Sequence, residues 1–404
     1  MLARDGAASK LPLDGVRVVD AATLMAAPWA ASYLGEFGAD VIKVEQPGIG
    51  DHQRRWGSKR DGIPLMWKSL SRNKRSLTLD LRKPRGAEIF RSLIGTADVL
   101  IENFRPGTLE RWGLGPDQLL ALNPRLVILR VTGYGQTGPY SAQPGFGTLA
   151  EGFSGFSHVV GEADGPPTLA NLPLGDGVAG ITGAYAVMVG LFGRANNGGR
   201  GQVIDLSLYE PLFRLLEPAM IDFDQLGIAQ GRIGNRSAHV APRNTYRCSD
   251  GQWVSLSGST QRIWERLCLA MGRPELATDP RFGSNEARIE HVEALDAEIG
   301  AWMADHPRDE VIRVMNEAEV AVGPIFDIPT IFKDPHFAAR QDLVEVDDPD
   351  FGSMRLANVV PRFSETPGRV STTGPAMGAH TDELLGELGI DAIEIASLRA
   401  EGVV

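Results

Sequence analysis

The sequence predicts an α/β protein with a large domain built on a parallel, doubly wound sheet and a smaller α+β domain after it. Two observations predict this fold. Short β-branched runs alternate with helical segments through residues 16–208, which is the rhythm of repeated strand–helix–strand units. Near Asn244 the pattern changes to a hairpin followed by several helical segments, which indicates a second domain.

The strands of the predicted sheet are short runs rich in valine, isoleucine and leucine. They cover residues 16–20, 39–45, 76–81, 97–103, 126–133 and 202–208. After the first of them, Pro28 suits the first turn of a helix that ends at Gly38. Residues 134–170 are rich in Gly, Pro and Ser and predict loops with one short helix. Further helices are expected at 85–94, at 117–122, from about 177 to 194 and near Glu210.

The second domain follows an irregular linker at residues 228–245. Residues 244–258 predict a β-hairpin that turns at Asp250 and Gly251. Helices are then expected at 261–271, 284–304 and 308–317. From about residue 321, short strands lead to a last helix that starts near Thr381.

Charge and composition exclude several classes of partner. The formal net charge of -11 repels nucleic acid and anionic membranes, so neither is expected as a partner. No uninterrupted apolar run reaches the roughly 18 residues of a membrane span, and the stretch from Ile181 to Phe192 is predicted to be a buried helix. Residues 1–15 lack an apolar signal-peptide core, and Cys248 and Cys268 show no metal or disulfide spacing. These features predict a cytoplasmic protein without a metal site.

Residues 133–138 match the G-x-G-x-x-G pattern of dinucleotide-binding folds, but their context differs. A helix should begin after the motif, whereas Pro139 and Pro144 continue the loop. The motif also follows the fifth strand rather than the first. We therefore expect no nicotinamide or flavin site. The segment is interpreted as a Gly-rich loop at the carboxyl end of a strand, where α/β sheets bind ligands.

A basic segment stands out in the acidic chain at residues 54–75. Two interpretations of it remain open. It binds phosphates, for which Arg and Lys are the usual ligands, or it is a solvated loop with ordinary surface charges. The segment contains Arg54, Arg55, Lys59, Arg60, Lys68, Arg72, Lys74 and Arg75, against one acid, Asp61.

Asp176 lies between two glycines at the start of the long apolar helix, and two interpretations of it also remain open. Aspartate is a favoured helix N-cap. Alternatively, Asp176 is a nucleophile: the flanking glycines leave space for a bulky thioester, helix N-terminal amides favour the ionised carboxylate, and free amides could stabilise an oxyanion. The seven histidines are scattered and form no triad or metal spacing, so none is a candidate.

Several segments, taken in order, resemble the class III CoA-transferase family (the CaiB/BaiF type). The resemblance spans nearly the whole chain, and the number and order of the segments make it specific. They are LPLDGVRVVD (11–20), GADVIKVEQPGIGD (38–51), NKRSLTLDL (73–81), ENFRPGTLERWGL (102–114), VTGYGQTGPY (131–140), DGPPTLANLPLGDGVAGITGAYAV (164–187), GQVIDLSLYE (201–210), DGQWV (250–254) and GAHTDELLGELG (378–389).

The resemblance implies a Rossmann-like large domain made from both chain ends, residues 1–225 and 321–404, around a small domain at 226–320. It also implies that two chains interlock as an obligate homodimer. The implied activity is that of an acyl-CoA:carboxylate CoA-transferase. In this reaction Asp176 attacks the thioester and carries CoA through anhydride and aspartyl-CoA intermediates. Coenzyme A enters as a substrate, and neither ATP nor a metal is required.

The same resemblance assigns contacts to individual residues. Asn103, Phe104 and Arg111 are expected to contact CoA, and Tyr134 to line the active site. The loop 257–260 corresponds to a flap in some members.

The resemblance also indicates which substrates to expect. Met25 stands where oxalate-using members carry Gln, whereas residues 145–156 and 162–169 are closer to relatives that act on C4 and C5 dicarboxylates. An acidic acceptor would need a cation. Arg236 and Arg243 are candidates for it, with ordinary surface charge as the other interpretation.

Three alternatives remain. The 2-methylacyl-CoA racemases of the same family use an Asp and a His, but Phe146 stands where the His would be needed, which disfavours two-sided proton exchange. Acyl-CoA hydrolysis would need only water in place of the acceptor. A non-catalytic CoA-binding protein is disfavoured by the presence of Asp176.

Overall fold

The computed structural model describes residues 10–258 and 260–404, and the chain forms two compact units. The large unit contains the segment that ends at Phe156, together with Leu169–Ile221 and Ala338–Val404. The small unit contains Ser157–Thr168 and Asp222–Phe337. The chain thus leaves the large unit after residue 221 and returns at 338, where we expected boundaries after 225 and 320.

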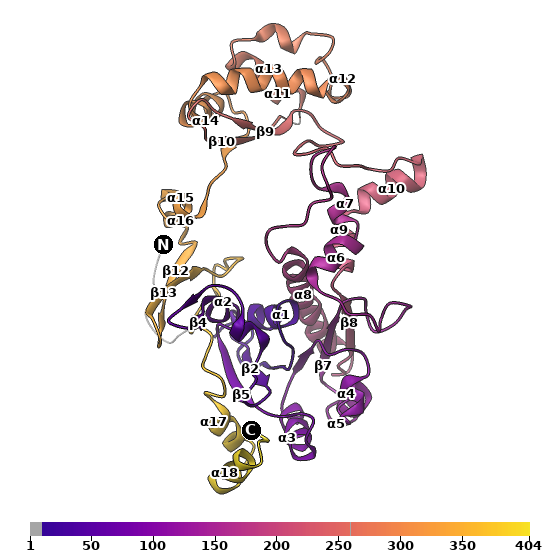
Figure 1. Ribbon diagram of the computed structural model, residues 1–404, viewed down its shortest axis with the longest axis vertical. Helices are drawn as coiled ribbons and strands as arrows, with labels where there is room; N and C mark the ends of the chain where they lie inside the picture. Colours follow the sequence, from indigo (N-terminus) through magenta and orange to yellow (C-terminus); the bar gives the residue numbers. More distant parts are fainter. Residues whose placement is uncertain (1–9, 259) are drawn as a thin grey trace. The chain divides into compact units, whose positions relative to one another are not determined.

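A six-stranded parallel sheet forms the centre of the large unit, in the order β5-β2-β1-β6-β7-β8 (Figure 1). The six predicted strands and the parallel α/β sheet are confirmed. The order runs outward from β1 in one direction and from β6 in the other, so the carboxyl ends of these two strands border the crevice where such sheets bind ligands. The strands are β1 (Arg17–Asp20), β2 (Asp40–Glu45), β5 (Lys74–Thr78), β6 (Val99–Glu102), β7 (Val127–Thr132) and β8 (Val203–Ser207).

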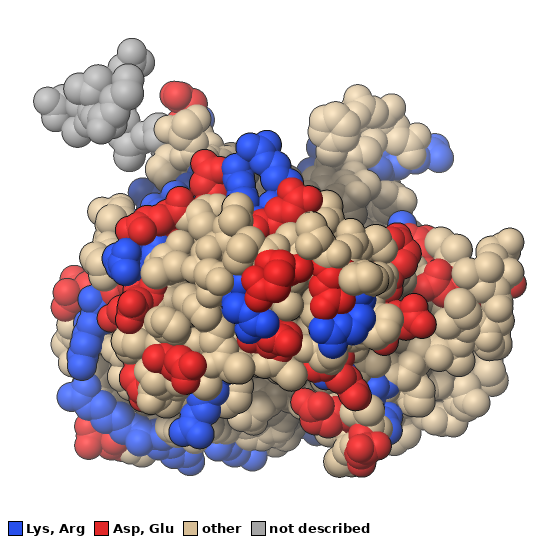
Figure 2. All heavy atoms as spheres, turned by 90° about the horizontal axis from the view of Figure 1, so that it is seen from above, with Lys and Arg blue, Asp and Glu red and all other residues tan. Residues whose placement is uncertain are grey.

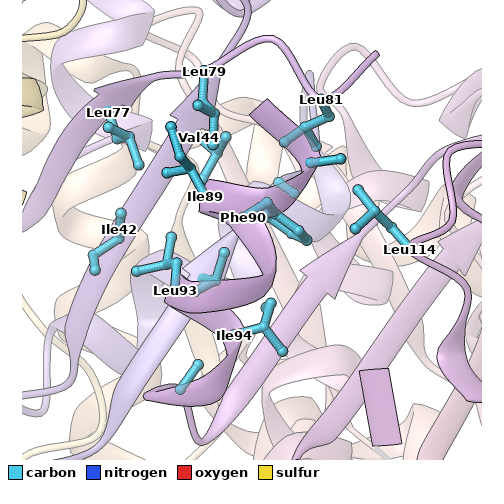
Figure 3. Packing of buried hydrophobic residues seen from close by; sticks show 14 of the residues in the cluster. Ile42, Val44, Leu77, Leu79, Leu81, Ile89, Phe90, Leu93, Ile94 and Leu114 are labelled. Atoms are coloured by element: carbon cyan, nitrogen blue, oxygen red, sulfur yellow. The ribbon is translucent and has the colours of Figure 1, made fainter. Parts of the chain in front are cut away.

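Helices cover both faces of this sheet. Helices α1 (Ala26–Gly35) and α8 (Leu174–Asn196) pack on one face. The core on the other face is formed with α3 (Pro84–Gly95), α5 (Pro116–Leu122), α17 (Thr381–Glu387) and α18 (Ala392–Ala400). Figure 3 shows Leu93 of α3 near Ile42 of the sheet, and Phe90 belongs to the same cluster. Phe90 is fully buried, which contributes roughly 1.5–3 kcal/mol relative to exposure.

Small residues let α1 and α8 approach closely. A methyl group added at Gly180 would lie 3.0 Å from the carbonyl oxygen of Ala26. One added at Gly183 would lie 3.3 Å from Cβ of Ala30. This packing brings the first residue of α1 next to the first turn of α8, which is where the candidate site forms.

Helix α8 buries only one of its faces. Ile181, Tyr185, Val189 and Phe192 are 59%, 69%, 50% and 74% exposed, and their spacing places them on the opposite side from the packed glycines. The expectation of a buried helix was wrong for this side. By length and composition alone α8 could cross a membrane, but its glycine-rich side packs within the large unit.

The small unit contains a three-stranded antiparallel sheet in the order β11-β10-β9. The predicted hairpin forms between β9 (Arg243–Arg247) and β10 (Trp253–Ser257), and β11 (Val322–Pro324) pairs with β10. The single helix expected at 284–304 was wrong, because the chain leaves the helical conformation at His291. The helices of this unit include α11 (Gln261–Ala270), α12 (Asn285–Glu290), α13 (Val292–Asp305) and α14 (Arg308–Glu317).

Short elements make up most of what remains, and only a few of them were expected: a helix near Glu210, one short helix within 134–170 and short strands after about residue 321. The expected last helix begins at Thr381 as α17, but α18 follows it. The short elements are η1 (His52–Arg55), β3 (Lys59–Arg60), β4 (Ile63–Pro64), α2 (Leu65–Leu70), α4 (Thr108–Arg111), α6 (Gly147–Phe153), α7 (Phe156–Val159), α9 (Glu210–Leu215), α10 (Glu217–Leu226), η2 (Pro274–Ala277), α15 (Ile328–Ile331), α16 (Pro335–Arg340), β12 (Leu343–Asp348) and β13 (Gly352–Ala357).

Candidate active site

A cavity of about 610 Å³ opens at the carboxyl ends of β1, β6 and β7. The residues that line it all belong to the large unit. Most come from the turn between β1 and α1, from the loops after β6 and β7, from α6, from the segment before α8 and from its first turn, and Trp56, Met66 and Leu208 complete the lining. The volume lies in the range of ordinary small-molecule sites. Asp176 is one of the lining residues.

Asp176 is the third residue of α8. Pro173 holds the N-cap position, and no side chain caps the helix there, so the N-cap interpretation of Asp176 was wrong. Instead, an interaction with the backbone N–H of Ala26, the first residue of α1, acts to lower the pKa of Asp176 and so favours the ionised form. The first N–H groups of a helix have no partner within it, so an anion is stabilised at this position.

A second carboxylate, that of Glu151, lies in the same cavity and was not predicted. Glu151 belongs to α6 and is 3% exposed. It accepts hydrogen bonds from the N–H groups of Ala170 (2.9 Å) and Gly175 (3.4 Å). Burial, and next the negative charge of Glu151, raise the pKa of Asp176 to about 6. The only sequence signal was an acid inside a short apolar segment.

The neighbouring charge predicts a pH effect. Replacing Glu151 with glutamine removes a negative charge that raises the pKa of Asp176, so the reactive carboxylate should persist to lower pH. We expect the acid limb of the kcat/KM profile, near pH 6 in the unmodified protein, to move to lower pH in this variant. An acid limb at the same position in both proteins would contradict the assignment of that limb to Asp176.

Glycines allow the backbone near Gly147 to lie close to the carboxyl group of Asp176. A methyl group added at Gly147 would lie 2.2 Å from Oδ2 of Asp176, and one added at Gly175 would lie 2.7 Å from the carbonyl oxygen of Gly147. A methyl group at Gly177, by contrast, would make only ordinary contact with the ring of Trp29, at 3.6 Å. The space beside the carboxylate therefore depends on Gly147, which was not predicted, and the space expected beside Gly177 stays a prediction.

Comparison with known proteins identifies the family. Residues 13–381 match the family model described as CoA-transferase family III. The chain belongs to this family. The resemblance drawn from the sequence is confirmed, and the chain is a class III CoA-transferase that passes CoA from an acyl-CoA to a carboxylic acid.

The similar proteins are full-length matches. The chain is 44% identical over 395 residues to the succinyl-CoA–D-citramalate CoA-transferase of Chloroflexus aurantiacus, with 97% of this chain and 98% of the relative covered. It is 44% identical over 405 residues to the beta subunit of the succinyl-CoA–L-malate CoA-transferase of the same organism, covering 99% and 100%. A crystal structure of a CAIB/BAIF family protein from Brucella suis superimposes with a TM-score of 0.82 at 32% identity, covering 94% and 100%.

Two of the expected CoA contacts of this CoA-transferase line the cavity. The side-chain amide of Asn103 accepts a hydrogen bond from the N–H of Thr23 (2.8 Å) and donates one to the carbonyl oxygen of Thr23 (2.7 Å). Phe104 lines the main cavity and also a smaller one of about 130 Å³ beside it. Thr23 and Phe104 are shared by both cavities, so a long ligand could extend from one into the other.

The other two expected residues lie elsewhere in the large unit. The exposed guanidinium of Arg111, in α4, donates to Oγ1 of Thr108 at 2.9 Å. Tyr134 packs in an aromatic cluster with Tyr140, Phe153 and Tyr209. Neither is among the residues that line the main cavity. Of the loop compared with a flap, residue 259 lies outside the described part of the chain.

Most of the basic segment at 54–75 is used in ion pairs within the large unit. Most of these pairs join a cation to a carboxylate that is distant in the sequence, which favours a structural role over an open phosphate patch. On the face drawn in Figure 2, acidic and basic side chains are interspersed. The pairs are Arg54–Glu45 (2.7 Å), Lys68–Asp348 (3.0 Å), Arg72–Glu36 (2.5 Å), Lys74–Asp20 (2.8 Å) and Arg75–Asp40 (2.6 Å).

Proposed function

We propose that this CoA-transferase moves CoA from succinyl-CoA, or a similar acyl-CoA, to a C4 or C5 dicarboxylic acid through a covalent intermediate on Asp176. The observation that carries the proposal is the position of that carboxylate. It lies in the cavity at the strand ends, next to a helix N-terminus and with backbone rather than side chains beside it. Relatives whose names specify succinyl-CoA with citramalate or malate support the choice of substrates.

The reaction is a series of acyl exchanges. A carboxylate oxygen of Asp176 attacks the thioester carbonyl of the donor, the C–S bond breaks, and CoA leaves as a thiolate. The thiolate attacks the Asp176 carbonyl of the resulting anhydride, which releases the donor acid and leaves an aspartyl-CoA thioester. The acceptor carboxylate then attacks the same carbonyl and displaces the thiolate. The thiolate finally attacks the acceptor carbonyl of the second anhydride, which forms the new acyl-CoA and restores Asp176.

The surrounding groups suit these steps. In the second and third steps the carbonyl under attack is that of Asp176, and its oxygen becomes negative. The N–H of Ala26 interacts with this carboxyl group and can donate to the developing oxyanion. Glu151 keeps its place by accepting two backbone N–H groups. Burial, and next the charge of Glu151, raise the pKa of Asp176 and make it a stronger base and nucleophile than an exposed aspartate.

We place CoA across the carboxyl edge of the sheet, with its thiol end in the main cavity and its path along Phe104 into the smaller cavity. Arg111 lies exposed in α4, where it could reach the phosphates. For the second carboxylate of the acceptor, Arg105 is the cationic side chain among the lining residues of the main cavity. Arg236 is paired with Asp296 at 2.8 Å, and Arg243 donates to backbone carbonyls, both within the small unit.

The racemase alternative receives less support. Phe146 lines the cavity, and no histidine is among the described residues around it. Proton exchange on both faces of a substrate would therefore depend on carboxylates alone.

We also propose that two copies of the chain associate as an interlocked, cytoplasmic homodimer. The exposed apolar side of α8, which includes Tyr185 and Phe192, is the kind of surface that a second chain covers. Buried free cysteines fit a reducing compartment. The Phe192→Lys variant should shift the mass measured by light scattering from dimer toward monomer. The matched variant Leu122→Lys, exposed on α5, should not. Equal masses would contradict the proposal.

The covalent route is tested by trapping. The protein is incubated with succinyl-, mesaconyl-, formyl- and 2-methylacyl-CoA and then treated with hydroxylamine, and the modified peptide is mapped by mass spectrometry. A hydroxamate on Asp176 with the dicarboxylic acyl-CoAs is the expected result. Exchange of the α-proton for deuterium without any adduct would overturn the proposal in favour of the racemase.

A further inference from the structure

The turn between β1 and α1 is held by side chains at every backbone polar group of three successive residues, Ala22, Thr23 and Leu24. None of these bonds comes from a neighbouring strand or helix backbone. The N–H of Ala22 donates to Asp20 Oδ1 (3.1 Å), and its carbonyl oxygen accepts from Lys43 Nζ. The N–H and the carbonyl oxygen of Thr23 both bond the side-chain amide of Asn103 (2.8 and 2.7 Å). The N–H of Leu24 donates to Asp51 Oδ1 (3.0 Å), and its carbonyl oxygen accepts from Gln53 Nε2.

This arrangement includes a strained residue. Leu24 has a φ of 69°, in the left-handed region that leucine rarely adopts. Such a conformation costs of order 1–3 kcal/mol and persists only where the surroundings enforce it. Here Asp51 accepts from the N–H of Leu24 and Gln53 donates to its carbonyl oxygen, and these two bonds hold Leu24 in this conformation.

The side chains that hold the turn are themselves costly to bury. Lys43 and Asp51 are paired at 2.8 Å with side chains that are 0% exposed, and Lys74 and Asp20 form an equally buried pair at 2.8 Å. Buried ion pairs of this kind are often no more stabilising than apolar residues of similar size. Stability alone therefore does not account for them.

The turn leads directly into the active site. Two residues after Leu24, Ala26 lines the main cavity together with Thr23, Leu24 and Asp176, and its N–H interacts with the Asp176 carboxylate. We propose that Lys43, Asp51, Gln53 and Asn103 are positioning residues that fix this turn, so that the Ala26 N–H stays aimed at the Asp176 carboxyl group through the reaction. The inference rests on the proposed covalent function of Asp176.

A fixed donor matters because the Asp176 oxygen alternates between carboxylate, carbonyl and oxyanion. A donor that is already in place stabilises the oxyanion without reorganisation when it forms. Displacements of about 1 Å at such positions can cost on the order of 100-fold in rate. The four side chains touch neither the carboxyl group nor, in our proposal, the reacting atoms, so they act through the backbone that they hold.

The test uses Gln53→Met, which removes the donor to Leu24 but keeps the length and leaves the ion pairs intact, and Asn103→Leu. Asn123→Leu is the matched control. Its amide also holds a loop, donating to the carbonyls of Ile94 (3.0 Å) and Ala97 (2.8 Å), but it lies before β7, at the opposite edge of the sheet. For each protein we would measure kcat, the pH profile of Asp176 trapping by hydroxylamine, and the melting temperature.

We expect Gln53→Met and Asn103→Leu to lower kcat roughly 10- to 100-fold. The Ala26 N–H lowers the pKa of Asp176, so its loss raises that pKa, and the acid limb of trapping should move to higher pH. Asn123→Leu should lower only the melting temperature. If Gln53→Met keeps the kcat of the unmodified protein and the same acid limb of Asp176 trapping, the inference is overturned. This holds even if Asn103→Leu does not fold. Absence of any Asp176 adduct in the unmodified protein would instead overturn the proposed function itself.

Discussion

Asp176→Asn is expected to lower the rate of CoA transfer at least ~10⁴-fold, as loss of a covalent nucleophile does in other enzymes. The amide has nearly the same shape as the carboxyl group, but it cannot form an anhydride with the donor. Initial rates with succinyl-CoA and a dicarboxylic acceptor measure the loss. Transfer within 10-fold of the unmodified protein would mean that no bond to Asp176 is needed, and would overturn the covalent route.

The stability of the same variant provides a control with a defined sign. The pKa of Asp176 is about 6 in the folded protein, above the value of about 3.9 expected when unfolded. The Asp176 carboxyl group therefore binds its proton more tightly in the folded state than in the unfolded state. Above pH 6, where it is ionised, it lowers the free energy of unfolding by up to about 3 kcal/mol. Asp176→Asn should thus melt at a higher temperature at neutral pH, and this gain should vanish below about pH 4. A lower melting temperature at neutral pH would point to misfolding instead.

Gly147→Ala is expected to lower kcat on the order of 100-fold or more. The new methyl group would lie 2.2 Å from Oδ2 of Asp176, so either the carboxyl group or the backbone of α6 has to move. Gly152 offers a matched control in the same helix, because a methyl group added there meets no atom within 4 Å. Gly152→Ala should keep full activity and gain up to about 1 kcal/mol of stability from its better helix propensity.

The measurements for this pair are kcat, trapping of Asp176 and the melting temperature. The steric account predicts slow trapping in Gly147→Ala and normal trapping in Gly152→Ala. If both variants react at the same rate as the unmodified protein, the carboxyl group does not need the space that Gly147 leaves.

The strands were predictable from sequence because a parallel sheet is buried on both faces, so each strand is a nearly continuous apolar run. Val99 to Ile101, for example, are all fully buried. Short elements such as α2 depend on contacts made elsewhere and carry no periodic signal. The interruption of the expected helix at His291 was equally hidden, since the apolar pattern continues through it.

The candidate site was predictable only in part. Asp176 was found from its glycine-flanked position and from the family resemblance. Glu151 was missed because its significance depends on a contact with the start of α8, which only the fold creates. The basic segment was ambiguous for a similar reason, since Glu36 and Asp348, which neutralise Arg72 and Lys68, are distant in the sequence.

The discontinuous large unit has a consequence for synthesis on the ribosome. Its core includes Leu384, Leu385, Ile395 and Leu398, which are among the last residues to be translated. The small unit ends at Phe337, so it can fold before α17 and α18 are made. Until then, the face of the sheet that packs against α3 lacks these two helices. During that interval the apolar surface around Phe90 stays open to chaperones and to other nascent chains. We expect mature catalytic sites to appear only after translation has finished, and slowing elongation after residue 337 should lengthen the interval in which the core stays open.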